Sequence, residues 1–168
     1  MNAFLWLLLN LVLYTVQNHW FMFFSTMQSP DLLLLLLLLF ALDKGGKKAA
    51  GYGLGLGAFL DIVTFSYFGF HMVTRASIGA LIGSNRMNVF ADRMPTFMVL
   101  SALTTLLLNV ARDLFLCIVL RRWLPFFPLA VLTLKCMFWN LLCAPFMWLL
   151  YHWLKRRFDS RRAYYYHL

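Results

Sequence analysis

The sequence predicts an all-α polytopic membrane protein, folded as one compact bundle of about six transmembrane helices. Of its 168 residues, 62% are hydrophobic and only 12% are charged, against about 25% charged residues in a typical soluble domain. The apolar residues also form long runs separated by short polar or basic gaps. So few polar side chains cannot cover a soluble surface, which excludes a soluble enzyme, a nucleic-acid-binding module and a disordered chain.

Six apolar runs follow one another along the chain. They cover residues 4–24, 32–42, 49–65, 72–83, 95–120 and 127–154. The first has 21 residues, no Lys or Arg before it and no small-residue cleavage site behind it, so we expect a retained anchor rather than a signal peptide. Pro30-Asp31 is a good start for the second helix. Its eleven residues rise only about 17 Å, so this segment borrows flanking residues, thins the membrane or does not cross.

The remaining runs are separated by recognisable breaks. A basic turn, 43–48, precedes the glycine-rich third run, and a loop at 68–70 leads to the fourth. The longest polar stretch is 84–93. Pro145 interrupts the sixth run, and a basic tail begins at Lys155. We expect one integral membrane domain over residues 1–168.

The basic residues indicate the orientation of this domain. Fifteen Lys and Arg against six Asp give a net charge of +9, and most of the cations lie in the gaps. With six spans and both termini inside, the inner side receives ten Lys and Arg, while the outer side receives only three: Arg75, Arg121 and Arg122. The positive-inside rule therefore predicts cytoplasmic N and C termini.

Alternating glycines open the third run. They are Gly51, Gly53, Gly55 and Gly57. No Gly-Lys-Ser/Thr ending follows and no strand precedes them, so they do not form a phosphate loop. In a helix they form two small-xxx-small pairs, 51/55 and 53/57, which we expect on adjacent faces that admit another backbone. The fourth run offers matching small residues: Ala76, Gly79, Ala80 and Gly83. We therefore expect these two helices to pack tightly.

Four ionisable residues within the runs are candidates for function. Asp61 continues the 53/57 face, and an interior functional role and a helix-capping role weigh equally. Arg112 and Asp113 point about 100° apart on a helix, so we expect each to find a partner on another helix or subunit. Lys135 is a candidate partner for Asp113 or Asp61. Such a set is either a proton relay or structural glue, and glue is favoured.

No catalytic constellation is readable in the sequence. The four His residues are scattered, and the three Cys lie in apolar runs without metal-ligand spacing. We therefore expect neither enzymatic activity nor a cofactor.

The stretch from Pro30 to Gly83 has a family pattern. A Pro-Asp opens a short leucine-rich helix, and a basic turn and a glycine-rich helix with Gly53-x-x-x-Gly57-x-x-x-Asp61 follow. Phe68-Gly69 then leads to a helix of small residues. With the short length, the N-terminal anchor and the basic tail, this pattern resembles the MreD family of rod shape-determining proteins. The likeness covers about half of the chain.

The resemblance implies a non-catalytic scaffold subunit of the cell-wall elongation complex, or elongasome, that docks partner transmembrane helices in the bacterial cytoplasmic (inner) membrane. It implies four protein partners: an MreC-like bitopic protein, the actin-like MreB, a SEDS glycosyltransferase and its penicillin-binding transpeptidase. Membrane lipid is a further expected partner, and nucleic acid is not. It also implies a six-helix fold similar to the substrate-binding (S-component) subunits of energy-coupling-factor vitamin transporters.

Such an S-component is the alternative function. These subunits typically have a small-xxx-small pattern on the first helix, whereas residues 4–16 here contain a single small-to-medium residue, Thr15. This difference favours the scaffold. The resemblance implies no role for Arg112, Asp113 or Lys135.

Overall fold

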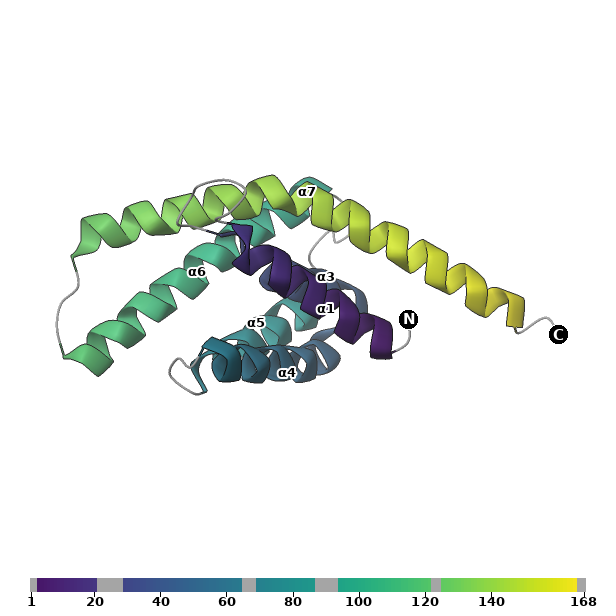
Figure 1. The fold of residues 1–168 in the computed structure, drawn as a ribbon, viewed down its shortest axis with the longest axis horizontal. Coiled ribbons are helices and arrows are strands. Elements are labelled where there is room, and N and C mark those ends of the chain that lie inside the picture. Colours follow the sequence, from purple (N-terminus) through teal and green to yellow (C-terminus); the bar gives the residue numbers. More distant parts are fainter. Residues whose placement is uncertain (1–2, 21–28, 65–68, 87–93, 122–124, 166–168) are drawn as a thin grey trace.

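The computed structural model describes residues 3–20, 29–64, 69–86, 94–121 and 125–165. Within these ranges the regular structure is helical, which confirms the all-α class. The helices are α1 (Ala3–Asn18), α3 (Leu32–Lys44), α4 (Gly46–Thr64), α5 (Phe70–Ser84), α6 (Met94–Leu120) and α7 (Phe126–Tyr165) (Figure 1). The helix expected at 4–24 is seen as α1, and residues 21–24 lie outside the described ranges. By length and composition, Met94–Leu120 and Phe126–Arg157 are apolar enough to cross a membrane.

Helix α3 forms the core of the protein. Its first eight residues are leucines, each at most 5% exposed, and the helix contacts α1, α4, α5 and α7. The Asp31 side chain caps its N-terminus by accepting a hydrogen bond from the Leu34 amide at 2.9 Å. The leucines of this 13-residue helix therefore pack against other helices rather than the surroundings.

The turn between α3 and α4 is much shorter than the predicted basic turn at 43–48. Helix α3 ends at Lys44 and α4 begins at Gly46, so Gly45 alone joins them. Gly45 has a φ of +85°, a conformation that residues with a Cβ rarely adopt. Its amide donates to the carbonyl of Ala41 at 3.0 Å and so closes the end of α3.

Helices α4 and α5 pack through direct backbone contact. An added Cβ at Gly53 would lie 2.5 Å from the Arg75 carbonyl oxygen. Gly57, Gly79 and Gly83 are equally tight against the backbone of the facing helix, with contacts below 3 Å. The small residues of both helices are therefore what lets α4 and α5 approach so closely.

The second glycine pair of α4 does not contribute to this interface. Gly51 and Gly55 are exposed, and a Cβ at either position would meet nothing within 4 Å among the described residues. The expectation that the two pairs lie on adjacent faces is wrong, because residues two apart on an α-helix are separated by about 200°. The pairs occupy nearly opposite sides of α4.

Helix α7 is continuous where the sequence predicts an interruption. It runs for 40 residues, with Pro145 inside it. The helix is bent (Figure 1), and Pro145 removes one backbone hydrogen bond, which bends a helix without ending it when packing supports both halves. The basic segment from Lys155, expected as a tail, continues this helix to Tyr165.

The α6–α7 pair projects beyond the other helices. The two helices pack against each other, and the hairpin tip that they form extends past the joined ends of α4 and α5 (Figure 1). Large apolar side chains near the tip are open to the surroundings: Ile118, Phe126 and Phe127 are 75%, 84% and 78% exposed. Arg121, at the end of α6, is also exposed. The apolar part of this surface suits lipid rather than water.

The glycine geometry generates the first prediction. Gly57→Leu should lower the thermal unfolding midpoint of the detergent-solubilised protein by roughly 6 °C or more, since it forces two backbones apart. Gly51→Leu adds the same side chain on the open side of α4 and should change the midpoint little. Equal losses for the two variants would contradict this account of α4.

Candidate functional site

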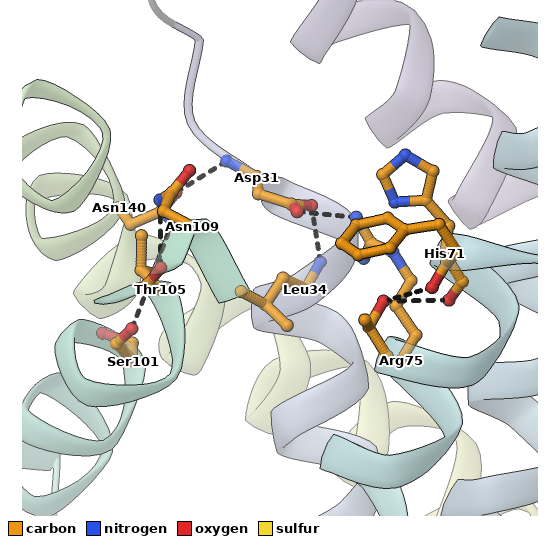
Figure 2. A network of polar contacts seen from close by, with 10 residues as sticks. Asp31, Leu34, His71, Arg75, Ser101, Thr105, Asn109 and Asn140 are labelled. Atoms are coloured by element: carbon orange, nitrogen blue, oxygen red, sulfur yellow. Dashed lines mark hydrogen bonds and ion pairs between the residues drawn. The ribbon is translucent and has the colours of Figure 1, made fainter. Parts of the chain in front are cut away.

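A polar centre lies where the N-terminal ends of α3 and α5 meet the middle of α6 and α7 (Figure 2). It consists of Asp31, Arg75, Thr105, Asn109 and Asn140. The Arg75 guanidinium donates to the Asp31 carboxylate at 2.6 Å. The Asp31 amide donates to the Asn140 side-chain oxygen at 2.6 Å, and the Asn140 amide group donates to the Thr105 hydroxyl at 2.8 Å. These contacts connect four helices in one network.

The Asp31–Arg75 ion pair is the most buried charge interaction of the network. Arg75 is 2% exposed, and a lone guanidinium there would be strongly destabilising in a low-dielectric interior. Asp31 neutralises it while also capping α3 through the Leu34 amide. One carboxylate thus fixes the start of α3 and the position of α5.

The sequence does not predict this pair. It indicates Asp31 only as a helix-start residue and places Arg75 among the outer basic residues. The structure places Arg75 inside α5 and buries it. The available signal was its position within an apolar run, where a charge requires a partner. Without the buried Arg75, the number of Lys and Arg expected on the outer side of the membrane falls from three to two, against ten on the inner side.

The polar side chains on α6 and α7 were also not singled out from the sequence. Asn109 donates to the Thr105 carbonyl at 3.0 Å, and the Thr105 hydroxyl donates to the Ser101 carbonyl at 2.7 Å. Asn140 is 1% exposed and reaches across from α7. An amide within an apolar helix is a signal for such interhelical hydrogen bonding.

Asp61 caps the N-terminus of α5 from the end of α4. Its carboxylate accepts from the amides of Gly69, His71 and Met72 at 2.8, 3.1 and 3.3 Å. The first amides of a helix have no partner within the helix, so an acceptor here stabilises it. Of the two roles left open by the sequence, the geometry shows capping. Asp61 thereby extends the contact between α4 and α5 beyond the glycines.

Arg112 and Asp113 pair with each other, which corrects the expectation of separate partners. The Arg112 guanidinium lies 3.2 Å from the Asp113 carboxylate. The arginine side chain is long enough to fold back although the two Cβ atoms diverge on the helix. Lys135 is exposed on α7, and no ion pair joins it to Asp61 or Asp113 among the described residues. Its expected partnership with either carboxylate is therefore wrong.

A second charged cluster lies at the other end of α3. Asp43 forms ion pairs with Lys155 and, at 2.9 Å, with Lys44, and it accepts a hydrogen bond from the Tyr151 hydroxyl at 3.2 Å. Arg86 donates to the Asp43 carbonyl at 3.0 Å. The cluster connects the end of α3 to α7 and to the residues that follow α5.

A cavity of about 220 Å³ adjoins the polar centre. Its polar lining includes Gln17, Asp31, His71, Asn109, Arg112 and Asn140. The volume is below the roughly 300–1,000 Å³ of pockets for drug-sized ligands. In the described part of the chain, no three His, Cys, Asp or Glu side chains gather as metal ligands.

A groove between α1 and α4 offers a different kind of surface. It measures about 440 Å³ and has an apolar lining that includes Trp6, Gly51, Gly55 and Phe59. Asn10 on α1 accepts a hydrogen bond from the Tyr52 hydroxyl at 2.6 Å, which holds the two walls together. The two glycines that α5 leaves free thus face this groove.

One comparison with known proteins gives a match. The family model described as rod shape-determining protein MreD matches residues 1–158 of the chain. The match includes α6 and most of α7, beyond the segment 30–83 that carries the resemblance in the sequence. No curated protein and no solved structure matches the chain.

The difference in burial between Arg75 and Arg112 generates the second prediction. Arg75→Met leaves the Asp31 carboxylate without its cation and should destabilise the protein by about 3 kcal/mol. Arg112→Met is the matched control, because Arg112 also pairs with an aspartate but its side chain is 38% exposed, and it should cost about 1 kcal/mol or less. Denaturation in mild detergent measures both. A larger loss for Arg112→Met would refute the central position of Arg75.

Proposed function

The chain belongs to the MreD family of rod shape-determining proteins, and we propose that in the rod-shape system it is a non-catalytic membrane scaffold. It acts by docking transmembrane helices of partner proteins in the cell-wall elongation complex. The proposed partners are an MreC-like bitopic protein, the actin-like MreB, and a SEDS glycosyltransferase with its penicillin-binding transpeptidase.

The open glycine face of α4 is the observation that supports docking most. Among the described residues, a Cβ at Gly51 or Gly55 would meet nothing within 4 Å, whereas α5 packs against the opposite face. The groove beside this face is apolar. Small residues allow close helix approach in membranes, where packing replaces the hydrophobic effect. We assign this groove, called here the docking groove, to the single transmembrane helix of the MreC-like partner.

The proposed membrane arrangement is one domain of six spans over residues 1–168, with both termini in the cytoplasm. The ten-to-two distribution of Lys and Arg supports this orientation. It places Lys44, Arg86 and Lys155 at the cytoplasmic end, where MreB is proposed to bind. It places the α6–α7 tip at the outer face of the inner membrane.

Charges on α6 and α7 are further candidates for partner contacts. Lys135 is exposed on an otherwise apolar part of α7. A cation at that depth requires a polar or anionic partner, or must snorkel to the interface. Arg112 and Asp113 are partly exposed on the neighbouring helix. We propose that a second partner helix approaches this side of the protein.

A vitamin-binding S-component is the alternative function. The polar cavity of about 220 Å³ is small for a vitamin-sized ligand. The first helix also lacks the small-residue pattern typical of such subunits. Binding of a vitamin to the purified protein would favour this alternative over the scaffold.

The third prediction tests the docking groove. Replacing both Gly51 and Gly55 with Leu should lower recovery of the MreC-like partner in detergent pull-downs by about tenfold, because single intramembrane contacts are worth only about 1–2 kcal/mol. Ser77→Leu adds similar bulk to an exposed position on α5 and should leave recovery unchanged. All variants should be expressed at equal levels. Full recovery with the double variant would exclude the groove as the partner site.

A further inference from the structure

The polar cavity lies where the C-terminal end of α1 and the N-terminal ends of α3 and α5 come together. Gln17 is near the end of α1, Asp31 immediately precedes α3, and His71 is in the first turn of α5. Helix α6 continues past this level, since Arg112 is followed by eight more residues to Leu120. At 1.5 Å per residue, the α6 end lies roughly 12 Å beyond the cavity. Figure 1 shows the α6–α7 tip extending past the ends of the neighbouring helices.

In the proposed membrane arrangement, the exposed apolar side chains near the α6–α7 tip place the cavity below the membrane surface. Ile118, Phe126 and Phe127 are mostly exposed and apolar, so in the membrane they face lipid chains. The cavity is therefore recessed within the apolar layer by the remaining length of α6.

The cavity wall contains polar groups whose burial at this depth costs free energy unless they have hydrogen-bond partners. Gln17 and His71 line the cavity. The Gln17 side-chain oxygen and the His71 Nδ1 are buried, and neither has a hydrogen-bond partner among the described residues. Arg112 also lines the cavity and is 38% exposed despite its pairing with Asp113. At membrane depth, such groups require a polar companion.

The charge balance of the wall indicates the chemistry of that companion. Asp31 is neutralised by Arg75, and Arg112 by Asp113. A ligand with a single net charge would disturb this balance, whereas a ligand with a cation and an anion preserves it. The unpartnered Gln17 oxygen is an acceptor and calls for an N–H or O–H donor, which the ammonium of such a ligand supplies. A volume of about 220 Å³ admits about seven waters, which suits a headgroup.

We propose that this cavity binds the headgroup of a zwitterionic lipid with a primary ammonium and a phosphate, such as phosphatidylethanolamine. The ammonium donates to the Gln17 oxygen and lies near Asp31. The phosphate accepts from the Arg112 guanidinium and from His71 in the tautomer that carries its proton on Nδ1. Phosphatidylcholine has no N–H donor and phosphatidylglycerol has no cation, so both fit less well. This assignment rests on the proposed membrane embedding and is independent of the docking groove, whose lining shares no residue with the cavity.

The fourth prediction follows from this selectivity. Purified protein is incubated with equimolar phosphatidylethanolamine, phosphatidylcholine and phosphatidylglycerol, and the retained lipid is counted by native mass spectrometry. The wild-type protein should retain one phosphatidylethanolamine with about tenfold preference over the other two lipids. Gln17→Met keeps the side-chain length but removes the acceptor, and Arg112→Gln removes the cation. Both variants should lose the preference.

Arg121→Gln is the matched control, because Arg121 is exposed at the end of α6 and outside the cavity lining. It should keep the preference. Equal retention of the three lipids by the wild-type protein, or a preference that survives in both cavity variants, would overturn the assignment. Full displacement of the lipid by soluble phosphoethanolamine would show that the headgroup alone suffices, and would overturn a lipid as the specific occupant. Normal recovery of the MreC-like partner by Gln17→Met, a residue outside the docking groove, would separate this result from the docking proposal.

Discussion

The ion pair between Asp31 and Arg75 is the contact on which the arrangement of the helices depends. It joins the start of the buried helix α3 to α5, and the Asp31 amide extends the connection to Asn140 on α7. A charge inside a low-dielectric interior is tolerated only with its partner in place. The pair therefore favours one arrangement of α3, α5 and α7 over others that would bury as many leucines. Burial of the leucines stabilises the fold but does not determine how α3 is rotated about its axis, because leucines surround the first two turns of the helix.

With this arrangement fixed, the two sides of α4 have different roles. The backbone of α5 packs directly against Gly53 and Gly57, and Asp61 caps the same helix. This side of α4 therefore holds the protein's own helices together. Gly51 and Gly55 remain open to a groove against α1. A small-residue face that no described helix covers is suited to recognising another helix. The proposed scaffold function in the rod-shape system follows from this division, and the lipid site at the ends of the short helices is a separate property of the same fold.

Much of the fold is predictable from the sequence, because apolar runs, glycine spacing and helix-start residues are local signals. The all-α class and the position of α5 against Gly53 and Gly57 follow from them. The pairing of charges is not local. Whether Arg112 reaches a neighbouring helix or folds back onto Asp113, and whether Arg75 lies in a loop or in the core, depends on distances that tertiary packing alone sets. Continuation of α7 through Pro145 likewise depends on packing that supports both halves of the helix.

The central claim is that Asp31 couples α5 to α7 through one polar network. The most direct measurement is a double-mutant cycle with Arg75→Met and Asn140→Leu, scored by the free energy of unfolding in detergent. Because both residues act on Asp31, their effects should be non-additive, with a coupling energy of about 1 kcal/mol or more. Additivity within about 0.3 kcal/mol would mean that the two contacts are independent, and would contradict the account.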